Sequence, residues 1–449
     1  AQTVAALAQT MSDAPADANA QAEPLDPAQP FALSPIQSWF FEQRFEASHH
    51  WNQSLMLAGE GGIDARRLER AIARLVAHHG ALRLRFTRGG EGWQQQAAAP
   101  GGAAPIDFLD LSAAADPQAA LAQAVERLQR GLSLEQPFRA ASIDLGSAGS
   151  RLLLAAHHLV VDTVSWRILL EDLEACYLQA RDEDAHADPL PRSASWQAWV
   201  AQLRSHADSP ALLAQLPYWR ALCGSGEPDL PGNAQGSNTV ADAEVATLEF
   251  DAAFTRRLVV DAARQARVRI DELLLTALAQ TLCRWTGRDS VLVELEGHGR
   301  EDIGDLDLSR SVGWFTSLYP QRLAAGGENL DADLKSVLGQ LRAVPGKGLG
   351  YGLLRHMHDQ GAVLSQASYP QVKFNYLGQF DERTGAQAAW RMADESAGTQ
   401  RAPGSRRRAW LDVGARVYQG RLSLQWTYSR HIHAGRDIEA LLAGMRERL

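Results

Sequence analysis

Residues 224–242 divide the chain into two halves, because this stretch is rich in Gly, Pro, Asn and Ser. Such a composition favours turns and loops. Each half combines helical runs, with apolar residues every third or fourth position, and short strand-like runs. In the first half, helices are predicted at 64–79, 116–131, 167–180, 193–207 and 210–222, and strands at 81–87, 139–145 and 152–156. In the second half, strands are predicted at 244–250, 290–296, 371–376, 411–417 and 421–428, and helices after Asp251 and at 271–285, 330–343 and 438–449.

The length of the chain points to more than one core. A chain of 449 residues is too long for one ordinary hydrophobic core, so we expect two or three domains or one large two-lobed unit. The repeated pattern favours a mixed α/β (α+β) fold with lobes at 31–223 and 244–449, joined by a linker at 224–243. Residues 1–30 are rich in Ala, Asp, Gln and Pro, which is a linker composition.

Two adjacent histidines, His157 and His158, lie where the apolar strand 152–156 gives way to a helical pattern. Such an edge suits chemistry, because the scaffold holds the backbone while a side chain faces a cavity. Adjacent strand residues point to opposite faces, so only one of the two imidazoles is expected to face that cavity. For the same reason, a metal site formed by His157, His158 and Asp162 is a weaker alternative. A carboxylate at a helix entrance, as at Asp162, more often caps the helix or forms an ion pair.

The stretch from His157 to Asp162 resembles the active-site motif of the condensation superfamily of nonribosomal peptide synthetases, and Val164–Leu169 looks like its epimerization branch. Further stretches match other motifs of the family, in the family order: Phe31–Glu42, Glu296–Glu301, Val312–Pro320, Gly346–Gly352 and Phe374–Asp381. The resemblance covers the chain from about Phe31 onward. Thr163 departs from it, because the family usually carries Gly or another small residue there, and this side chain would narrow the channel.

The resemblance implies two chloramphenicol-acetyltransferase-like subdomains that form a V-shaped pseudo-dimer, with the active site in a tunnel between them. It identifies His158 as the catalytic histidine and His157 as a structural neighbour. It also assigns a catalytic role to Glu296, because this residue distinguishes epimerization from condensation domains. Asp162 is expected to have a structural role and to pair with Arg300 of the other lobe.

Asn375 and Tyr376 end a predicted strand. Their amide and phenol groups could donate hydrogen bonds to a developing oxyanion. The alternative is that both residues have structural roles, with Tyr376 in the core and Asn375 in a turn. The glycine run 346–352 lacks the spacing of a phosphate-binding loop, so a flexible loop near the substrate channel is expected instead. A solvated loop is expected at 406–408.

The function implied is inversion of the α-carbon of an aminoacyl or peptidyl thioester. Removing the α-proton requires a positioned base and stabilisation of the enolate. Inversion also requires a proton to leave one face and return to the other, which His158 and Glu296 are expected to do from opposite lobes. Two alternatives stay open. One is a condensation domain that forms a peptide bond between two carrier-bound substrates, and the other is a catalytically silent domain that docks carriers.

The substrate is expected to arrive on another domain, because the chain contains neither a carrier motif of the form G-G-x-S-[LI] nor a nucleotide-binding signature. We therefore expect no intrinsic cofactor and no metal. The expected partner is an upstream peptidyl carrier domain that presents the substrate on its 4'-phosphopantetheine. Residues 1–30 would then follow that carrier, with a disordered tail as the alternative. A downstream condensation domain is a further candidate partner.

The net charge, the apolar stretches and the cysteines argue against several other classes of protein. The net charge of −9 argues against a general nucleic-acid binder, because neutralising phosphates needs a concentrated basic surface. No stretch approaches the ~18 apolar residues of a membrane span. Cys176, Cys223 and Cys283 are odd in number and widely spaced, which indicates neither a disulfide framework nor a zinc site and favours the cytoplasm.

Overall fold

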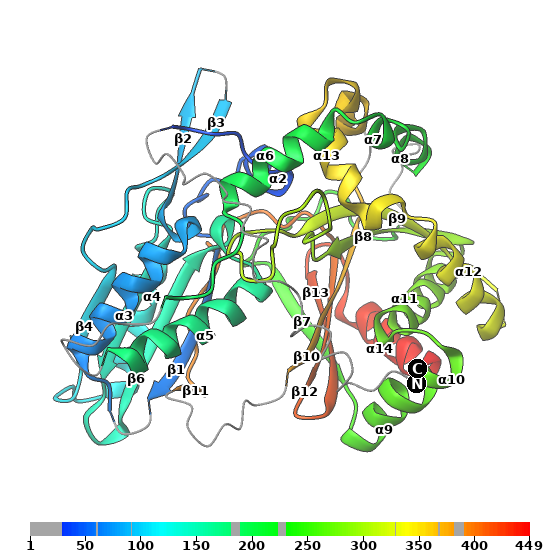
Figure 1. Ribbon diagram of the computed structural model, residues 1–449. Coiled ribbons are helices and arrows are strands. Elements are labelled where there is room, and N and C mark those ends of the chain that lie inside the picture. Colours follow the sequence, from blue (N-terminus) through cyan, green and yellow to red (C-terminus); the bar gives the residue numbers. More distant parts are fainter. Residues whose placement is uncertain are drawn as a thin grey trace, which may run out of the picture.

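The computed structural model describes residues 29–59, 62–90, 92–180, 189–222, 230–327, 329–366, 369–380 and 390–449. Most of the predicted linker 1–30, together with Cys223, lies outside the described residues. The described residues form two lobes, each built on its own β-sheet and hydrophobic core. Figure 1 shows that the lobes meet near the top of the view and diverge below, as the two arms of a V. The expected mixed α/β fold is confirmed.

The first lobe contains a five-stranded sheet with the strand order β11-β1-β6-β5-β4. Its strands are β1 (Asn52–Gly59), β4 (Ile106–Asp110), β5 (Phe138–Asp144), β6 (Ser150–His157) and β11 (Trp390–Met392). The helices α3 (Ala65–His78) and α5 (Thr163–Gln179) cover one face of this sheet, and α4 (Pro117–Arg130) covers the other. Strand β6 is therefore buried on both faces, which explains its continuous apolar run. A separate hairpin pairs β2 (Leu84–Gly89) with β3 (Gly92–Ala97).

The second lobe contains a six-stranded sheet with the strand order β7-β13-β12-β10-β8-β9. Its strands are β7 (Ala243–Glu249), β8 (Ser290–Gly297), β9 (Ser317–Ala324), β10 (Val372–Phe380), β12 (Leu411–Tyr418) and β13 (Arg421–Ser429). The core formed with this sheet includes residues of α11 (Ile270–Thr286), α12 (Leu330–Arg342) and α14 (Gly435–Arg448). Two short helices, α9 (Ala252–Arg256) and α10 (Ala263–Ala266), precede α11. The turn of the last hairpin falls at Gln419 and Gly420, as predicted, and both residues have positive φ (48° and 70°).

A group of helices joins the lobes. It comprises α2 (Pro35–Glu42), α6 (Trp196–Ala207), α7 (Pro210–Leu213), α8 (Leu216–Leu222) and α13 (Leu349–Met357). Although α13 comes from the second half of the sequence, its Leu353 and Leu354 are fully buried in the core of the first lobe. The two halves of the sequence therefore share one core at this junction.

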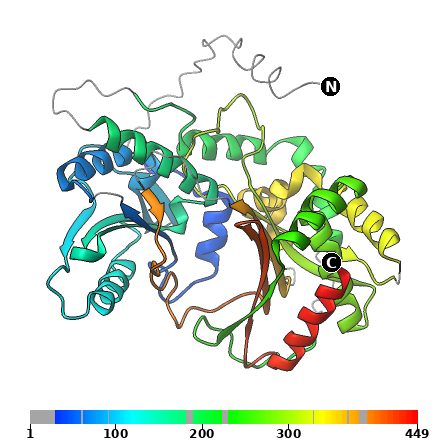
Figure 2. The same cartoon turned by 90° about the horizontal axis from the view of Figure 1, so that it is seen from below.

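Strand β11 also crosses between the lobes. It pairs with β1, with Leu57 opposite Met392, although it lies in the second half of the sequence. In Figure 2 the orange arrow of β11 lies among the blue and cyan elements of the first lobe, and the chain then returns to the second sheet. The predicted division places all of residues 244–449 in the C-terminal lobe. The structure differs, because β11 belongs to the sheet of the first lobe. The short strand carries too little periodicity of its own to indicate which sheet it joins.

The glycine run 346–352 differs from the flexible loop that its sequence predicts. After a short 3₁₀ turn at Pro345–Gly348, residues from Leu349 onward are helical. Gly348 has φ 90°, and a Cβ there would lie 2.0 Å from the ring of Tyr319. A Cβ on Gly350 would lie 2.1 Å from Gln215. These glycines thus permit close packing rather than motion.

Candidate functional site

His157 ends β6 and is fully buried in the first lobe. Its Nε2 lies 2.8 Å from the carbonyl oxygen of Ser48, and its Nδ1 accepts a hydrogen bond from the backbone amide of Leu159 at 3.1 Å. Burial lowers the pKa of His157 to about 3, although the bond to Ser48 opposes this shift. The imidazole is therefore neutral, with both ring nitrogens bound to the backbone. Its complete burial in the core keeps it away from a metal ion or a substrate proton.

His158 points away from that core and is only partly buried. Its Nδ1 lies 2.8 Å from the carbonyl oxygen of Val161, which can only accept, so Nδ1 carries the proton. Its Nε2 is 3.0 Å from the side-chain nitrogen of Gln53. Burial lowers the pKa of His158 to about 4, against the opposing effect of the bond to Val161. At neutral pH this residue is therefore an uncharged base whose lone pair lies on Nε2.

Gln53 and Trp166 determine the tautomer of His158. The indole Nε1 of Trp166 can only donate, and it lies 2.9 Å from the side-chain oxygen of Gln53. This contact orients the amide of Gln53 so that its nitrogen faces His158 and donates to Nε2. Trp314 packs against the ring of His158 with a centroid distance of 4.3 Å. The sequence analysis missed Gln53, which lies among three polar residues at the start of β1 and carries no signal that sets it apart from its neighbours.

Asp162 occupies the N-cap of α5. One of its oxygens accepts from the backbone amide of Ser165 at 2.7 Å, and the other accepts from the backbone amide of Phe315 at 3.1 Å. A guanidinium nitrogen of Arg300 lies 3.1 Å from the first oxygen. Arg300 also donates to the carbonyl oxygen of Ser311 at 2.7 Å. The carboxylate thus joins the helix after the histidines to the loop that follows β8, and the contact between Asp162 and Arg300 is present.

Glu296 lies near the end of β8 in the second lobe and is held by two neighbours from β10. The ammonium of Lys373 is 2.5 Å from one carboxylate oxygen, and the amide nitrogen of Asn375 donates to the other at 2.5 Å. Burial works against the charge on Lys373, but the carboxylates of Glu296, Asp412 and Glu294 outweigh it and raise the pKa of the lysine. Lys373 was missed in the sequence analysis, although a lysine inside an apolar strand is an unusual residue.

Asn375 and Tyr376 separate onto opposite faces of β10. Adjacent strand residues alternate, so Asn375 lies on the face that carries Glu296 and Lys373. Tyr376 packs against the hydrophobic core of the second lobe, where burial and the charge of Asp271 raise its pKa. The structure therefore brings Asn375 to Glu296, but it does not bring Tyr376 there.

His158 and Glu296 interact electrostatically across the two lobes. Burial dominates the lowered pKa of His158, but the charge of Glu296 raises this pKa and the charge of Arg401 lowers it. Arg401 belongs to the segment that returns from β11 to the second sheet. A neutral imidazole and a carboxylate thus approach one region from different lobes, with the charge of an arginine acting on both. This arrangement can move a proton to and from a group bound in that region.

The predicted solvated loop 406–408 is partly buried. Arg407 donates to the carbonyl oxygen of Thr427 at 2.8 Å. Arg408 donates to the side-chain oxygen of Gln43 at 2.8 Å and lies over the ring of Tyr369. Only Arg406 of the three is exposed. The expectation was wrong because the partners of these arginines come from distant parts of the chain.

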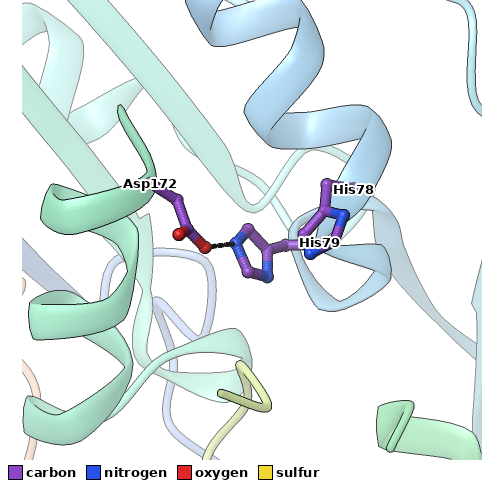
Figure 3. Close-up of side chains that lie close together, drawn as sticks. All are labelled: His78, His79 and Asp172. Carbon is purple, nitrogen blue, oxygen red and sulfur yellow. Dashed lines mark hydrogen bonds and ion pairs between the residues drawn. The ribbon is translucent and has the colours of Figure 1, made fainter. Parts of the chain in front are cut away.

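His78, His79 and Asp172 form another cluster with potential metal ligands, drawn in Figure 3. Here the Nε2 of His79 lies 2.8 Å from one oxygen of Asp172, and a guanidinium nitrogen of Arg310 lies 2.5 Å from the other. The Nε2 of His78 instead faces the carbonyl oxygen of Pro191 at 3.1 Å. A cation here would meet the positive charge of Arg310 and ligands that are already engaged, so the cluster fits a structural brace between α5 and the loop after β8.

Among the described residues, none of the helices combines the length and the apolar composition that a membrane span requires.

A family model for the condensation domain matches residues 28–449. A linear gramicidin synthase protein of Brevibacillus parabrevis is 40% identical over 434 residues, which cover 93% of this chain and 6% of that protein. Chondramide synthase cmdD of Chondromyces crocatus is 38% identical over 452 residues, which cover 98% of this chain and 11% of that protein. The chain therefore spans only a small part of the length of these curated relatives.

Solved structures share the fold. The epimerization domain from the third module of tyrocidine synthetase B is 32% identical, with a TM-score of 0.85 and coverage of 94% of this chain and 95% of that one. The X-domain from teicoplanin biosynthesis is 17% identical, with a TM-score of 0.74 and coverage of 95% of this chain and 96% of that one. The second likeness concerns the fold alone. The expected architecture of two chloramphenicol-acetyltransferase-like lobes is confirmed.

Proposed function

Because this chain belongs to the condensation domain family of nonribosomal peptide synthetases, we propose that it inverts the α-carbon of an aminoacyl or peptidyl thioester. The observation that carries the proposal is the pair formed by His158 and Glu296. His158 is a neutral base with its lone pair on Nε2, and Glu296 is a carboxylate on the facing lobe. The 32% identity to an epimerization domain over 94% of this chain supports it.

The proposed reaction uses the two residues in turn. One of them removes the α-proton, and the electron pair of the C–H bond moves onto the thioester to form an enolate. The other residue then donates a proton to the opposite face of the same carbon. In the reverse direction the roles exchange. Neither step requires a cofactor, because the thioester itself stabilises the carbanion once its oxygen is solvated by hydrogen-bond donors.

The contacts of Glu296 suit this role. Lys373 contacts one oxygen of the carboxylate and Asn375 the other, so the orientation of the carboxylate is determined. A carboxylate held in this way has a defined direction of approach, which proton transfer to one face of a carbon demands. By contrast, condensation between two carrier-bound substrates uses an acceptor amine and has no evident use for Glu296.

The substrate is proposed to arrive on the 4'-phosphopantetheine of a peptidyl carrier domain located upstream in the same synthetase. The relatives are synthetase proteins far longer than this chain, which is consistent with delivery by a neighbouring domain. The carrier would insert its arm between the lobes, so that the α-carbon lies between His158 and Glu296. A downstream condensation domain is proposed as the recipient of the product.

A single experiment separates the proposed function from its rivals. The isolated protein is incubated with an L-aminoacyl thioester on a carrier domain, and the released amino acid is analysed on a chiral column. An epimerase produces a mixture of the L and D forms. A condensation domain leaves chirality unchanged and yields a dipeptide only when a second, amine-bearing carrier is added. A docking domain binds the carrier and does neither, and either of these last two results contradicts the proposal.

A further inference from the structure

The site described so far lacks an evident partner for the oxygen of the enolate. Removing the α-proton places negative charge on the thioester oxygen, which needs a preorganised donor. Asn375 already donates to Glu296, and Tyr376 packs against the core of the second lobe. Gln53 is oriented by Trp166 and faces His158. A further donor is therefore required in the same region.

Arg401 is brought close to His158 by the segment that follows β11. The backbone amide of Asn52 donates to the carbonyl oxygen of Gln400 at 2.7 Å, and Arg401 forms an isolated antiparallel bridge with Trp51. The carbonyl oxygen of Trp51 in turn accepts from the backbone amide of His158 at 2.8 Å. Arg401 is thus attached to the first lobe at the start of β1, the strand that pairs with β6, and His158 directly follows β6.

The guanidinium of Arg401 has no hydrogen bond or ion pair with any residue that the structure describes. It lies over the ring of Trp51, with its central carbon 4.0 Å from the ring centroid. It is partly buried, and burial lowers its pKa, while the charges of Asp412 and Glu296 oppose this shift. An arginine carries five N–H donors. No nitrogen of Arg401 is among the fully buried, unpartnered atoms of the described residues, so these donors stay accessible to a ligand.

Other arginines of the described residues that are buried or partly buried have hydrogen-bond or ion-pair partners. Arg300 pairs with Asp162, Arg355 pairs with Glu42 at 2.7 Å, and Arg407 donates to the carbonyl oxygen of Thr427. Arg401 thus differs from them in keeping its donors available while it faces both His158 and Glu296 electrostatically. The stacking on Trp51 holds the guanidinium plane without using its N–H groups.

We propose that Arg401 is the catalytic residue that binds the thioester oxygen and stabilises the enolate, an inference that rests on the function proposed above. The α-C–H bond breaks, the proton passes to His158 or Glu296, and the electron pair is delocalised onto the oxygen. N–H groups of Arg401 donate to this oxygen. When the carbon is protonated from the other face, the electron pair returns and the carbonyl is restored, so no oxidant or co-reactant is consumed.

The inference predicts an effect on both enantiomers. The enolate is common to the L and D substrates, so Arg401→Gln should slow α-proton exchange from both by the same factor, roughly 10²–10³-fold. Exchange is measured as uptake of deuterium from deuterated water by each aminoacyl carrier. Carrier affinity and thermal melting should stay at the wild-type values. Arg406→Gln, which changes an exposed arginine of the same segment, is the matched control and should exchange at the wild-type rate.

Two further readouts separate a catalytic from a merely structural role. Because the charge of Arg401 lowers the pKa of His158, its removal should move the acid limb of the exchange rate to higher pH. Glu296 and His157, the other titratable groups near His158, are unchanged in this variant. Arg401→Lys keeps the charge but loses the planar donor array, so it should exchange faster than Arg401→Gln and about tenfold more slowly than the wild type.

Several outcomes would overturn the inference. An exchange rate at the wild-type level in Arg401→Gln would do so. A loss of exchange confined to one enantiomer would also do so. So would an equal loss of exchange in the Gln and Lys variants together with a lowered melting temperature. If Arg401→Gln does not fold, the Lys variant decides, and a wild-type rate with that variant contradicts the inference. Failure of the proposed function is recognised separately, because the wild-type protein itself would then neither invert nor exchange its substrate.

Discussion

At the residue scale, His158 and Glu296 are expected to act on opposite faces of one carbon. A variant that lacks one base can still deprotonate the enantiomer that faces the other base, and it returns deuterium to the same face without inversion. His158→Ala and Glu296→Gln should therefore show opposite preferences in deuterated water, one labelling the L substrate and the other the D substrate. Mass spectrometry after chiral separation measures this. Inversion at near wild-type rate by either variant would be incompatible with the two-base reaction.

The same scale yields a pH dependence of stability. Burial lowers the pKa of His157 from 6.5 to about 3, so the unfolded chain binds a proton in a pH range where the folded chain does not. The free energy of unfolding should therefore fall as the pH drops below the unfolded pKa, by about 1.4 kcal/mol per pH unit for this histidine. Above pH 6.5 this histidine is neutral in both the folded and the unfolded chain, so it causes no loss of stability there.

His157→Gln tests this dependence, because its amide can still donate to the carbonyl oxygen of Ser48 but does not titrate. Urea unfolding of both proteins at several pH values should give a shallower decline for the variant between about pH 6 and pH 4. Other buried histidines, such as His433, contribute equally to both proteins and cancel in the comparison. Identical declines would mean that His157 is not held neutral by burial.

At the element scale, the start of α5 depends on Asp162. Asp162→Ala removes the N-cap, the contact to Phe315 and the pairing with Arg300, so the free energy of unfolding should fall by about 1–3 kcal/mol. Asp162→Asn is the matched control, because its amide oxygen can still cap the helix while the charge is lost. It should be less destabilised in thermal melts. An Ala variant with unchanged melting and no activity would instead make Asp162 catalytic.

At the scale of the whole molecule, the lobes are expected to fold as one unit. Strand β11 and helix α13 come from the second half of the sequence, but they complete the sheet and the core of the first lobe. Residues 31–223 expressed alone should therefore lack the single cooperative thermal transition of the full chain. Circular dichroism during heating measures this. A cooperative transition at the melting temperature of the full chain would show that the first lobe does not need these segments.

The sequence by itself determined the helices, most strands and the positions of the motifs. Asp64, Asp116 and Asp251 were recognised as the starts of helices, and the structure places the side-chain oxygen of each on a backbone amide three residues later. Such signals could be predicted because the interactions that cause them span only a few residues. The motif resemblance also gave the family, the two-lobed fold and His158 and Glu296 as candidates.

Only the tertiary structure decided how the site is assembled. The orientation of His158 depends on Gln53, 105 residues away, and the position of Glu296 depends on Asn375, 79 residues away. Asn375 thereby becomes a partner of Glu296 instead of a free oxyanion donor, and Arg401 reaches the site because β11 joins the first sheet. Contacts between residues so distant in sequence leave no local periodicity, because they arise when strands from distant parts of the chain pair within one sheet.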